Sequence, residues 1–455
     1  MNVKKIKKIN YIFNPKSIAV VGASDKELTV GNGLIKNLES EGERKLFYVN
    51  PNDNEVLGRE TYKKISHIKS KIDLVIIIVH AGLIPQIIKE CCAKKVGGIL
   101  VISNGFSEAG EEGKKLEKEI TTMASKADIP LIGPNCLGVI NTWADLNASF
   151  SPINPQKGDI ALLSQSGSMV DAILDISAEE SFGFSKVISY GNEADLTLED
   201  FLLYLKNDKE TKVIALYFEA IKNGQGFMEA VREVSKYKPV VAIKAGKGAQ
   251  GQKAATTHTG ALSTDYEIYK AALKQSGAIQ VDSLEEMLDV IEVLDFQPRC
   301  ENNIAIITNG GGLGVLATDY CEEMKINLPE LENKTIRLME KEESMEKVLT
   351  KRNPLDIIGD AVSARYEAGI RSLLEQENIS GLLIMQSMQI MTEPLENAKI
   401  IVELNKKFPK KAIVCCFAGK KLVAEAIEYL EKNKIPNYAD PYRAVNALNN
   451  LIKRK

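Results

Sequence analysis

The chain repeats one short phrase three times: Ile18-Ala19-Val20-Val21-Gly22-Ala23-Ser24, then Ile160-Ala161-Leu162-Leu163-Ser164-Gln165-Ser166-Gly167-Ser168, then Ile304-Ala305-Ile306-Ile307-Thr308-Asn309-Gly310-Gly311-Gly312-Leu313-Gly314. Each copy is an apolar run that enters a turn of small residues and then a helical pattern. Such a run is typical of a buried parallel strand that leads into a helix. Because the three copies are spaced almost evenly along 455 residues, the sequence predicts three consecutive α/β domains.

Further apolar runs predict the other strands of these domains, at residues 46–49, 74–79, 98–102, 213–218, 240–243, 381–385 and 412–416. Continuous apolar strands between amphipathic helices indicate parallel sheets with helices on both faces. We therefore predict a Rossmann-like domain over residues 1–142, followed by two flavodoxin-like domains over 143–298 and 299–455. Linkers are expected at residues 150–158 and 296–303, which are rich in turn-forming residues.

The composition is that of an ordinary soluble globular protein, 44% hydrophobic and 26% charged. A formal net charge of -3 without a long basic face argues against nucleic acid as a partner. The longest apolar run, residues 74–79, is too short to span a bilayer, and no secretory segment follows the lysine-rich start. We therefore expect a cytoplasmic protein with no membrane contact. The 7 cysteines lack CxxC spacing, so we expect reduced thiols and no metal site.

His258 is one of only 3 histidines, and it lies in a stretch of glycine, alanine and threonine over residues 247–260. We expect this stretch to be a loop between a strand and a helix, where open α/β sheets bind ligands. Small residues let the backbone approach an anion, and a neutral imidazole is a good nucleophile. The competing interpretation is an ordinary hydrogen-bonded histidine, which is how we interpret His67.

Two of the repeated turns are candidate anion sites: Ser166-Gly167-Ser168 and Gly310-Gly311-Gly312 place backbone amides at the start of a helix. The alternative is that these glycines serve only strand–helix packing. Glu219 directly follows the strand at 213–218, so its carboxylate emerges where it can orient a histidine. A capping or surface glutamate is the alternative there. With His258, the loops predict a cradle for a phosphorylated imidazole.

The first turn does not match a dinucleotide fingerprint, which would need glycine in place of Ser24 and Glu27. Asn50 also stands where an acidic residue is expected to bind a ribose. The sequence therefore disfavours an NAD-dependent dehydrogenase. Ser24, which we expect at a helix N-terminus, can still hold a nucleotide phosphate.

These motifs resemble the α subunit of ADP-forming (NDP-forming) acyl-CoA synthetases of the acetyl-CoA synthetase type, relatives of succinyl-CoA synthetase. The resemblance covers nearly the whole chain. Besides the phosphate loop at 164–167 and Phe218-Glu219, it is carried by residues 15–24, 133–141, 256–261, 308–314 and 353–359. The first domain is then the CoA-binding domain, the second carries the phosphohistidine loop, and the third is the CoA-ligase domain.

The resemblance implies a ligase that forms carbon–sulfur bonds. Acyl-CoA and phosphate give an acyl phosphate and CoA; His258, held by Glu219, takes the phosphoryl group and passes it to ADP. Phosphate is assigned to the two glycine loops described above. Coenzyme A, a substrate, is assigned by position to Gly22, Ala23, Ser24, Asn50, Pro51, Val79, Ser103, Asn104 and Asn135.

The chain has no ATP-grasp segment and no P-loop motif. The resemblance therefore places ADP, ATP and Mg²⁺ on a separate ATP-grasp β subunit, in an α2β2 heterotetramer. Relatives commonly carry a lysine where this chain has Asn52-Asp53, and a proline where it has His80. We interpret His80 as a structural replacement beside the CoA site; a second chemical group is the alternative. The alternative function is a noncatalytic CoA-binding or regulatory protein of the same fold. The preferred acyl group is not predicted.

Overall fold

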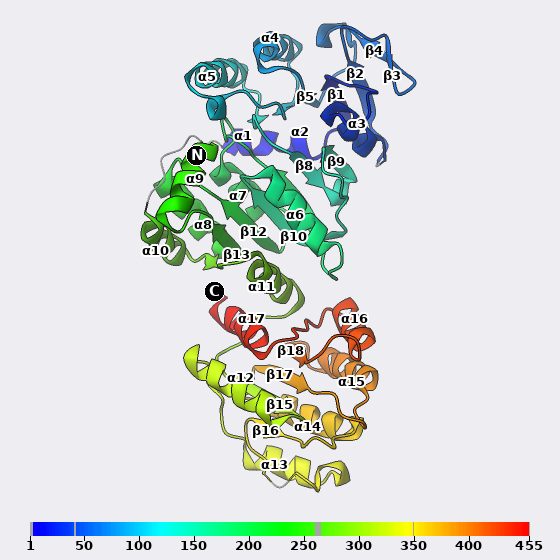
Figure 1. Ribbon diagram of the computed structural model, residues 1–455, viewed down its shortest axis with the longest axis vertical. Helices are drawn as coiled ribbons and strands as arrows, with labels where there is room; N and C mark the ends of the chain where they lie inside the picture. Colours follow the sequence, from blue (N-terminus) through cyan, green and yellow to red (C-terminus); the bar gives the residue numbers. More distant parts are fainter. Residues whose placement is uncertain (1–2, 41, 260–264, 349, 455) are drawn as a thin grey trace. The chain divides into compact units, whose positions relative to one another are not determined.

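The computed structural model describes residues 3–40, 42–259, 265–348 and 350–454 (Figure 1). The chain forms two compact units, Met1–Met287 and Leu288–Lys455. The first unit holds two sheets and the second holds one, so each copy of the repeated phrase supplies a strand of a different sheet.

The first sheet has the Rossmann-like strand order that the sequence predicts. Its parallel strands β1, β2, β4, β5, β6 and β7 are arranged as 3-2-1-4-5-6, and the short β3 pairs with β4 in the antiparallel direction. The order reverses between β1 and β5, and ligands bind at such a reversal. The strands are β1 (Ser17–Val21), β2 (Lys45–Val49), β3 (Glu55–Val56), β4 (Arg59–Tyr62), β5 (Leu74–Ile77), β6 (Gly98–Val101) and β7 (Leu131–Ile132).

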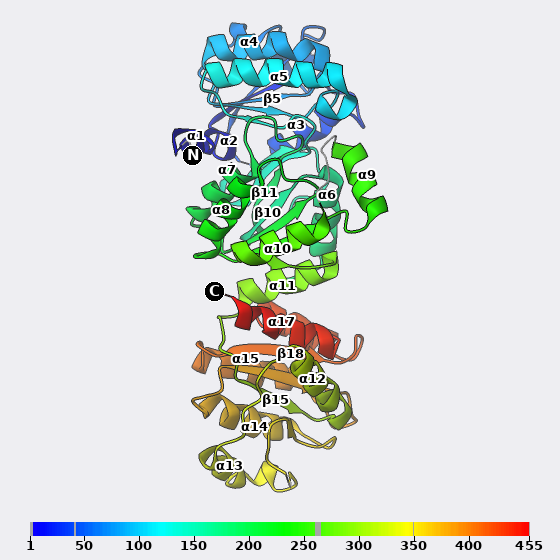
Figure 2. The ribbon, with the colours of Figure 1, turned by 90° about the vertical axis from the view of Figure 1, so that its left-hand side faces the viewer.

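Helices cover both faces of this sheet. The evidence is that every residue of β1 is buried, although successive side chains of a strand point to opposite faces. Ile18 and Val20 join a cluster with the apolar side of α3, while Ala19 and Val21 pack in a second cluster with α4 and α5. Figures 1 and 2 show α4 and α5 together over one face. The helices are α1 (Val3–Lys8), α2 (Asn10–Phe13), α3 (Val30–Ser40), η1 (Ile65–His67), η2 (Ala81–Leu83), α4 (Ile84–Lys94), η3 (Ser107–Ala109) and α5 (Glu111–Lys126).

The second sheet contains the flavodoxin-like order 2-1-3-4-5, formed by β10 to β14. Its switch point lies between β10 and β12. This sheet adds an antiparallel part to the predicted parallel strands, because β8 pairs with β11, and β9 with β8, in the antiparallel direction. The strands are β8 (Gly138–Asn141), β9 (Leu146–Ser149), β10 (Lys157–Ser164), β11 (Phe184–Ser189), β12 (Val213–Phe218), β13 (Val240–Lys244) and β14 (Ile279–Gln280).

The β8–β9 hairpin has a physical reason, since a short connection can join only antiparallel neighbours. That connection is η4 (Thr142–Ala144), so the chain enters the second sheet before the predicted boundary at residue 142. The predicted domain boundaries remain predictions. The helices that follow are α6 (Gly167–Ser177), α7 (Leu198–Lys206), α8 (Gly224–Ser235), α9 (Ala249–Thr259), α10 (Tyr266–Ser276) and α11 (Leu284–Phe296).

The sheet of the second unit has four parallel strands in the order 2-1-3-4, the first part of the same flavodoxin-like order. One face packs against α13 to α16 in a single buried cluster. The strands are β15 (Ile304–Thr308), β16 (Leu355–Asp356), β17 (Gly381–Gln386) and β18 (Ala412–Phe417). The helices are α12 (Gly311–Glu323), α13 (Asn333–Glu340), η5 (Glu343–Met345), α14 (Ser363–Glu375), α15 (Pro394–Lys407), α16 (Ala424–Lys432) and α17 (Pro441–Lys453).

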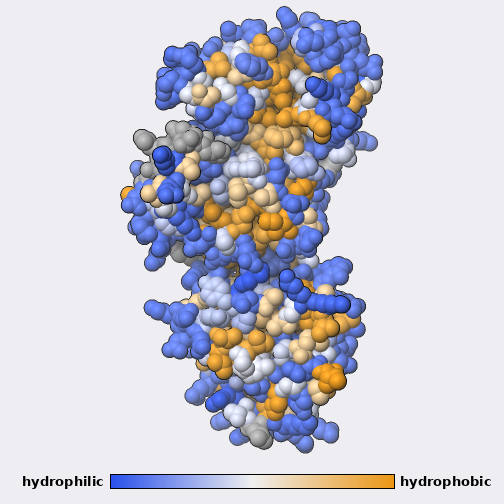
Figure 3. All heavy atoms as spheres, viewed as in Figure 1, coloured by the Kyte–Doolittle hydropathy of each residue, from blue (hydrophilic) through white to orange (hydrophobic). Residues whose placement is uncertain are grey.

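Within the described part of the chain, no helix combines the length and the apolar character needed to cross a bilayer. On the face drawn in Figure 3, hydrophobic side chains gather in the hollow of the first unit, in the upper part of the view.

Candidate functional site

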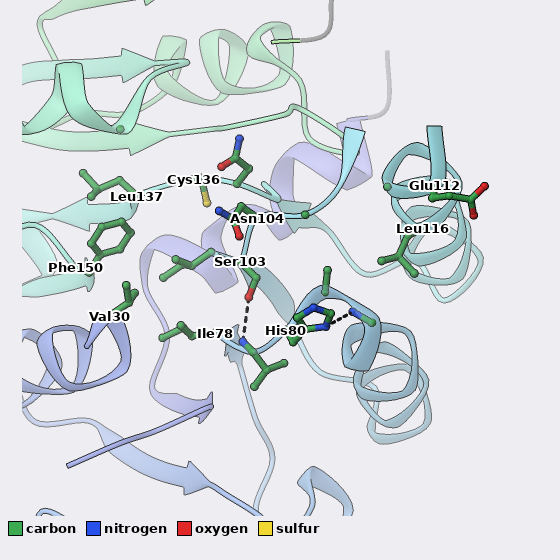
Figure 4. Close-up of a pocket in the computed structure, with 18 residues that line it drawn as sticks. Val30, Ile78, His80, Ser103, Asn104, Glu112, Leu116, Cys136, Leu137 and Phe150 are labelled. Carbon is green, nitrogen blue, oxygen red and sulfur yellow. Dashed lines mark hydrogen bonds between the residues drawn. The ribbon is translucent and has the colours of Figure 1, made fainter. Parts of the chain in front are cut away.

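A cavity of about 830 Å³ lies at the carboxyl ends of β5, β6 and β7 in the first unit (Figure 4). Four of the residues assigned to CoA line it, namely Val79, Ser103, Asn104 and Asn135. The rest of the lining is mostly apolar and includes Val30, Ile78, Ile102, Leu116, Leu137 and Phe150. A mainly apolar cavity of this size with a few polar groups is typical of a small-molecule site.

Ser103 and Asn135 are held in place by bonds between neighbouring strand ends. The Ser103 hydroxyl accepts a hydrogen bond from the Val79 backbone N–H at 3.0 Å, which joins the loops after β5 and β6 (Figure 4). The Asn135 backbone N–H donates to the Ser103 carbonyl at 2.9 Å. Asn135 has a positive φ of 58°, a conformation that asparagine tolerates better than most residues. These bonds fix the polar wall of the cavity.

Gly22 lies at the switch point of the first sheet but not in the cavity wall. Its φ is +95°, and a Cβ at this position would lie 2.1 Å from the carbonyl oxygen of Ile78. Only glycine therefore allows the turn after β1 to lie against the end of β5. Its amide donates to the Val49 carbonyl at 3.1 Å, which ties the turn to β2 as well.

The expectation that Ser24 lies at a helix N-terminus is wrong. Helix α3 begins at Val30, and the Thr29 hydroxyl accepts from the Asn32 N–H at 3.3 Å in its first turn. Residues 25–29 form a separate turn, in which the Ser24 hydroxyl accepts from the Lys26 N–H at 3.1 Å. Neither Ala23 nor Ser24 is among the residues that line the cavity.

Asn50 and Pro51 also lie outside the cavity wall. The Asn50 side-chain amide donates to the Ala23 carbonyl at 3.0 Å and to the Asp53 carboxylate at 2.7 Å, and its oxygen accepts from the Asn52 N–H. Asn50 thus joins the ends of β1 and β2. This arrangement explains an asparagine here without requiring a ligand.

The Ser166 loop, which follows β10, opens onto the same cavity, because Gly167 is one of the lining residues. Ser166 is the N-cap of α6, and its hydroxyl accepts from the Met169 N–H at 3.4 Å and lies 3.0 Å from the Ser168 hydroxyl. The amides of Gly167 and Ser168 come first in the helix, where no intrahelical acceptor exists. This position suits an anion.

Glu219 emerges at the carboxyl end of β12, across the switch point from the Ser166 loop, and is buried. Gln165 joins the two strand ends, since its side-chain oxygen accepts from the N–H groups of Glu219 at 2.8 Å and Ala220 at 3.1 Å. Burial, and after it the Glu219 carboxylate and its hydrogen bond, raise the pKa of Tyr217 to about 12. Sequence reasoning missed Gln165, although it stands inside the quoted motif.

Glu193, in the turn after β11, is a second buried carboxyl group that sequence reasoning missed. Its Oε1 accepts from the Leu198 N–H at 2.5 Å, at the start of α7. Burial raises the pKa of Glu193 to about 7, against the effects of that hydrogen bond and of the Lys222 charge. No pattern in the sequence separates Glu193 from a solvated glutamate.

His258 lies in helix α9, so the prediction of a loop at this position is wrong. Alanine, glutamine and lysine between residues 249 and 255 are strong helix formers and explain the helix. Helix α9 contacts η3, near the Gly105 side of the cavity. The His258 side chain lies outside the described residues, so its predicted pairing with Glu219 remains a prediction.

The third glycine loop, Gly310-Gly311-Gly312, starts α12 in the second unit. A cavity of about 670 Å³ lies beside it and is lined by Gly311 and by the charged residues Asp319, Lys347, Arg352 and Asp356. Because this loop and the Ser166 loop belong to separate compact units, the predicted common cradle remains a prediction. Within the described residues, no group of three or more His, Cys, Asp or Glu side chains is placed to hold a metal ion.

Family models match the three sheets in turn. Residues 16–142 match a CoA binding domain, residues 157–294 a succinyl-CoA ligase like flavodoxin domain, and residues 304–450 a ligase-CoA domain.

The chain is similar over nearly its whole length to two acetate–CoA ligases. It is 39% identical to "Acetate--CoA ligase [ADP-forming] I subunit alpha" of Pyrococcus furiosus, over 97% of this chain and 96% of that protein. It is 42% identical to "Acetate--CoA ligase [ADP-forming] I" of Archaeoglobus fulgidus, over 97% of this chain but only 63% of that longer protein.

A solved structure has the same fold. It is the dinucleotide forming acetyl-coenzyme A synthetase 1 of Ca. Korarchaeum cryptofilum in complex with phosphate and ADP, which superimposes with a TM-score of 0.93 at 33% identity. The match covers 98% of this chain and 96% of that one. The chain therefore belongs to the family of ADP-forming acetate–CoA ligases, in the superfamily of succinyl-CoA synthetase, and it matches their α subunits.

Proposed function

We propose that this chain is the α subunit of an ADP-forming acid–CoA ligase. The enzyme interconverts acyl-CoA, phosphate and ADP with a carboxylic acid, CoA and ATP. One observation carries this proposal: Gly167, at the start of α6, lines the same cavity as the Ser103, Asn104 and Asn135 side chains. A group that binds phosphate and a pocket that fits a thioester thus share one space.

The first step joins phosphate to the acyl group. A phosphate oxygen attacks the thioester carbonyl carbon, the carbon–sulfur bond breaks, and the sulfur takes up a proton to give CoA and an acyl phosphate. The amides of Gly167 and Ser168, at the positive end of α6, stabilise the charge on the phosphate during this step.

The second step moves the phosphoryl group onto His258. The histidine nitrogen attacks phosphorus and the carboxylate leaves, so one long transfer becomes two short ones. Glu219 positions the histidine, and Gln165 holds the Glu219 backbone against the phosphate loop. The phosphohistidine then delivers its phosphoryl group to ADP. The Gly310-Gly311-Gly312 loop is proposed as a second phosphate site.

We assign CoA binding to the cavity residues Val79, Ser103, Asn104 and Asn135, and to the neighbouring strand ends with Gly22, Ala23, Ser24, Asn50 and Pro51. The domains are proposed to divide at residues 142 and 298. The acyl group is proposed to be acetyl, as in the names of the relatives.

The nucleotide is proposed to bind on a separate ATP-grasp subunit, with Mg²⁺, in a cytoplasmic α2β2 assembly. The names of the relatives support a second component. The Pyrococcus furiosus protein of matching length is named as one subunit, whereas this chain spans 63% of the longer Archaeoglobus fulgidus protein. The purified chain alone should then bind CoA and make no ATP; ATP synthesis without a partner would contradict this division.

The test is transfer of labelled phosphate from acetyl phosphate to the full-length chain. Wild-type protein should gain label that is labile in acid and stable in base. His258→Ala should lose it entirely, and Glu219→Gln should label about 10- to 100-fold more slowly, because a hydrogen bond to a charged group is weakened.

His67→Ala is the matched control, since His67 is an exposed histidine in η1 and lies outside the cavity. It should label at the wild-type rate. If wild-type protein binds CoA but gains no label, or if His258→Ala is still labelled, the noncatalytic CoA-binding alternative replaces this proposal.

A further inference from the structure

The cavity in the first unit has an unusual balance of charge for a site proposed to bind a polyanion. Among the described residues that line it there is no lysine or arginine. Of these described lining residues, Ser103, Asn104 and Asn135 are polar, Glu112 is acidic, and His80 is the one able to carry a positive charge. If CoA binds here, as proposed above, the donors that the described wall offers its phosphate groups are neutral apart from His80, and they include the amides at the start of α6 beside Gly167.

His80 is held in a defined orientation by its own loop. It is the N-cap of η2, directly after β5, and its Nδ1 accepts a hydrogen bond from the Gly82 N–H at 3.3 Å (Figure 4). In a neutral imidazole one nitrogen accepts and the other donates, so the proton is assigned to Nε2. The side chain is exposed, so Nε2–H can reach a ligand in the cavity.

Among the described residues that line the cavity, His80 has no lysine or arginine as a neighbour. Figure 4 places His80 on the side of the cavity that faces Leu116 and Glu112 of α5. The Glu112 carboxylate is paired with Lys115 at 2.6 Å, which offsets part of its repulsion. At the end of β2 the chain has Asn52 and Asp53, and the Lys63 ammonium that reaches this loop donates to the Asp53 carbonyl at 3.2 Å.

We propose that His80 is a specificity-determining residue that binds a phosphate group of the CoA-type ligand, with Nε2–H donating to a phosphate oxygen. This inference rests on the proposed function, since it takes the cavity as the CoA site. It replaces the interpretation of His80 as a structural substitute for proline.

The test compares ligands with and without phosphate on His80→Asn in the full-length chain. Asparagine can still accept from the Gly82 N–H and cap η2, but its side chain is too short to donate into the cavity. Calorimetry should show that His80→Asn binds CoA about tenfold more weakly than wild type does. Pantetheine, which has no phosphate, should bind to His80→Asn and to wild type with the same affinity. If His80→Asn also binds 3′-dephospho-CoA more weakly, the His80 contact is with the diphosphate. If only the binding of CoA is weakened, the contact is with the 3′-phosphate.

Two further variants keep the result decisive. His80→Pro fits the observed φ of -53° and should show the same loss for CoA if His80→Asn folds poorly. His67→Asn, outside the cavity, should bind all three ligands normally. Equal binding of CoA by wild type and both His80 variants, or equal loss for pantetheine, would overturn the inference. If wild-type protein itself binds no CoA, the proposed function fails instead.

Discussion

The Ser166 loop after β10 and the Gly310 loop after β15 are built alike up to the first turn of the helix. In the first, the Ser164 hydroxyl donates to the Ser166 carbonyl at 2.7 Å and accepts from the Ser166 N–H at 3.1 Å. In the second, the Thr308 hydroxyl makes the same two bonds with Gly310, at 3.1 and 3.0 Å. A buried hydroxyl two residues before the N-cap therefore shapes both turns.

The two loops differ in the groups that surround the N-terminus of the helix. Ser166 caps α6 with its own side chain, whereas Gly310 gives α12 no side-chain cap. Gly167 opens onto a cavity without a lining lysine or arginine among the described residues, whereas Gly311 lies beside the Asp356 carboxylate. The repeated phrase thus specifies the turn, and the surroundings decide whether the helix end is available to an outside anion.

The largest effect should come from filling the first loop. A Cβ at Gly167 would lie 3.1 Å from the Leu137 Cβ, whereas a Cβ at Gly312 meets no other atom within 4 Å. Gly167→Val should lower the rate of acyl phosphate formation by about 10²- to 10³-fold, the scale of losing an oxyanion donor. Gly312→Val should lower it less than tenfold. Steady-state rates with the partner subunit measure both, and equal losses would remove the distinction between the loops.

The sequence predicted the strands well because their signal is local. The apolar run at 213–218 becomes β12 with the predicted bounds, and all three repeated phrases become strand–turn–helix units. It failed where the outcome depends on distant parts of the chain. The antiparallel β8–β9 pair depends on which strand edge is free, and the place of Ser24 depends on a turn that competes with the helix start.

The site was predicted only in part, for the same reason. Gly167, Val79, Ser103, Asn104 and Asn135 share a cavity because motif residues sit at strand ends. The hydrogen bond from the Glu219 N–H to Gln165 spans 54 residues of sequence. Glu193 is buried by tertiary packing, although its hydrogen-bond partner Leu198 is only 5 residues away. No sequence pattern reports such packing.

The second effect is a pH dependence that should separate the two units. The pKa of Glu193 is raised from its ordinary value of 4.5 to about 7, so the folded protein keeps a proton that the unfolded chain loses between these values. Its stabilising contribution is present below pH 4.5 and is lost as the pH rises through 7. At about 1.4 kcal/mol per pKa unit, the loss is at most about 3.5 kcal/mol.

Fluorescence can follow this loss, because the single tryptophan, Trp143, lies in the first unit. Its thermal transition should fall between pH 5 and 8 in wild type and fall less in Glu193→Gln. In the second unit, Lys347 and Arg365 lower the pKa of Asp360 to about 2, so this group stays ionised throughout the range. An identical fall in wild type and Glu193→Gln would show that Glu193 does not titrate there.

The third effect tests the shared turn. Ser164→Ala and Thr308→Val each remove a buried hydroxyl, so that a backbone N–H and a carbonyl lose their hydrogen-bond partner. Each change should lower the free energy of unfolding by about 1–3 kcal/mol. Only Ser164→Ala should shift the Trp143 transition in denaturant, whereas circular dichroism should detect both. The two changes should add to within about 0.5 kcal/mol in the double variant if the two compact units unfold independently of one another. A larger deviation would mean that the units are energetically coupled.

The smallest effect concerns the Asp356 carboxylate, which lies beside the Gly310 loop. The Asp356 Oδ2 lies 3.0 Å from where a Cβ of Gly311 would be, at the positive end of α12. Asp356→Asn removes the negative charge, and its Oδ1 can still accept from the Ile358 N–H at 2.9 Å. At about 0.3–1 kcal/mol for a charge at a helix end, the KM for phosphate should fall about two- to fivefold. Asp319→Asn, further along α12, should leave it unchanged. An unchanged or higher KM in Asp356→Asn would mean that this helix end does not contact phosphate in the reaction.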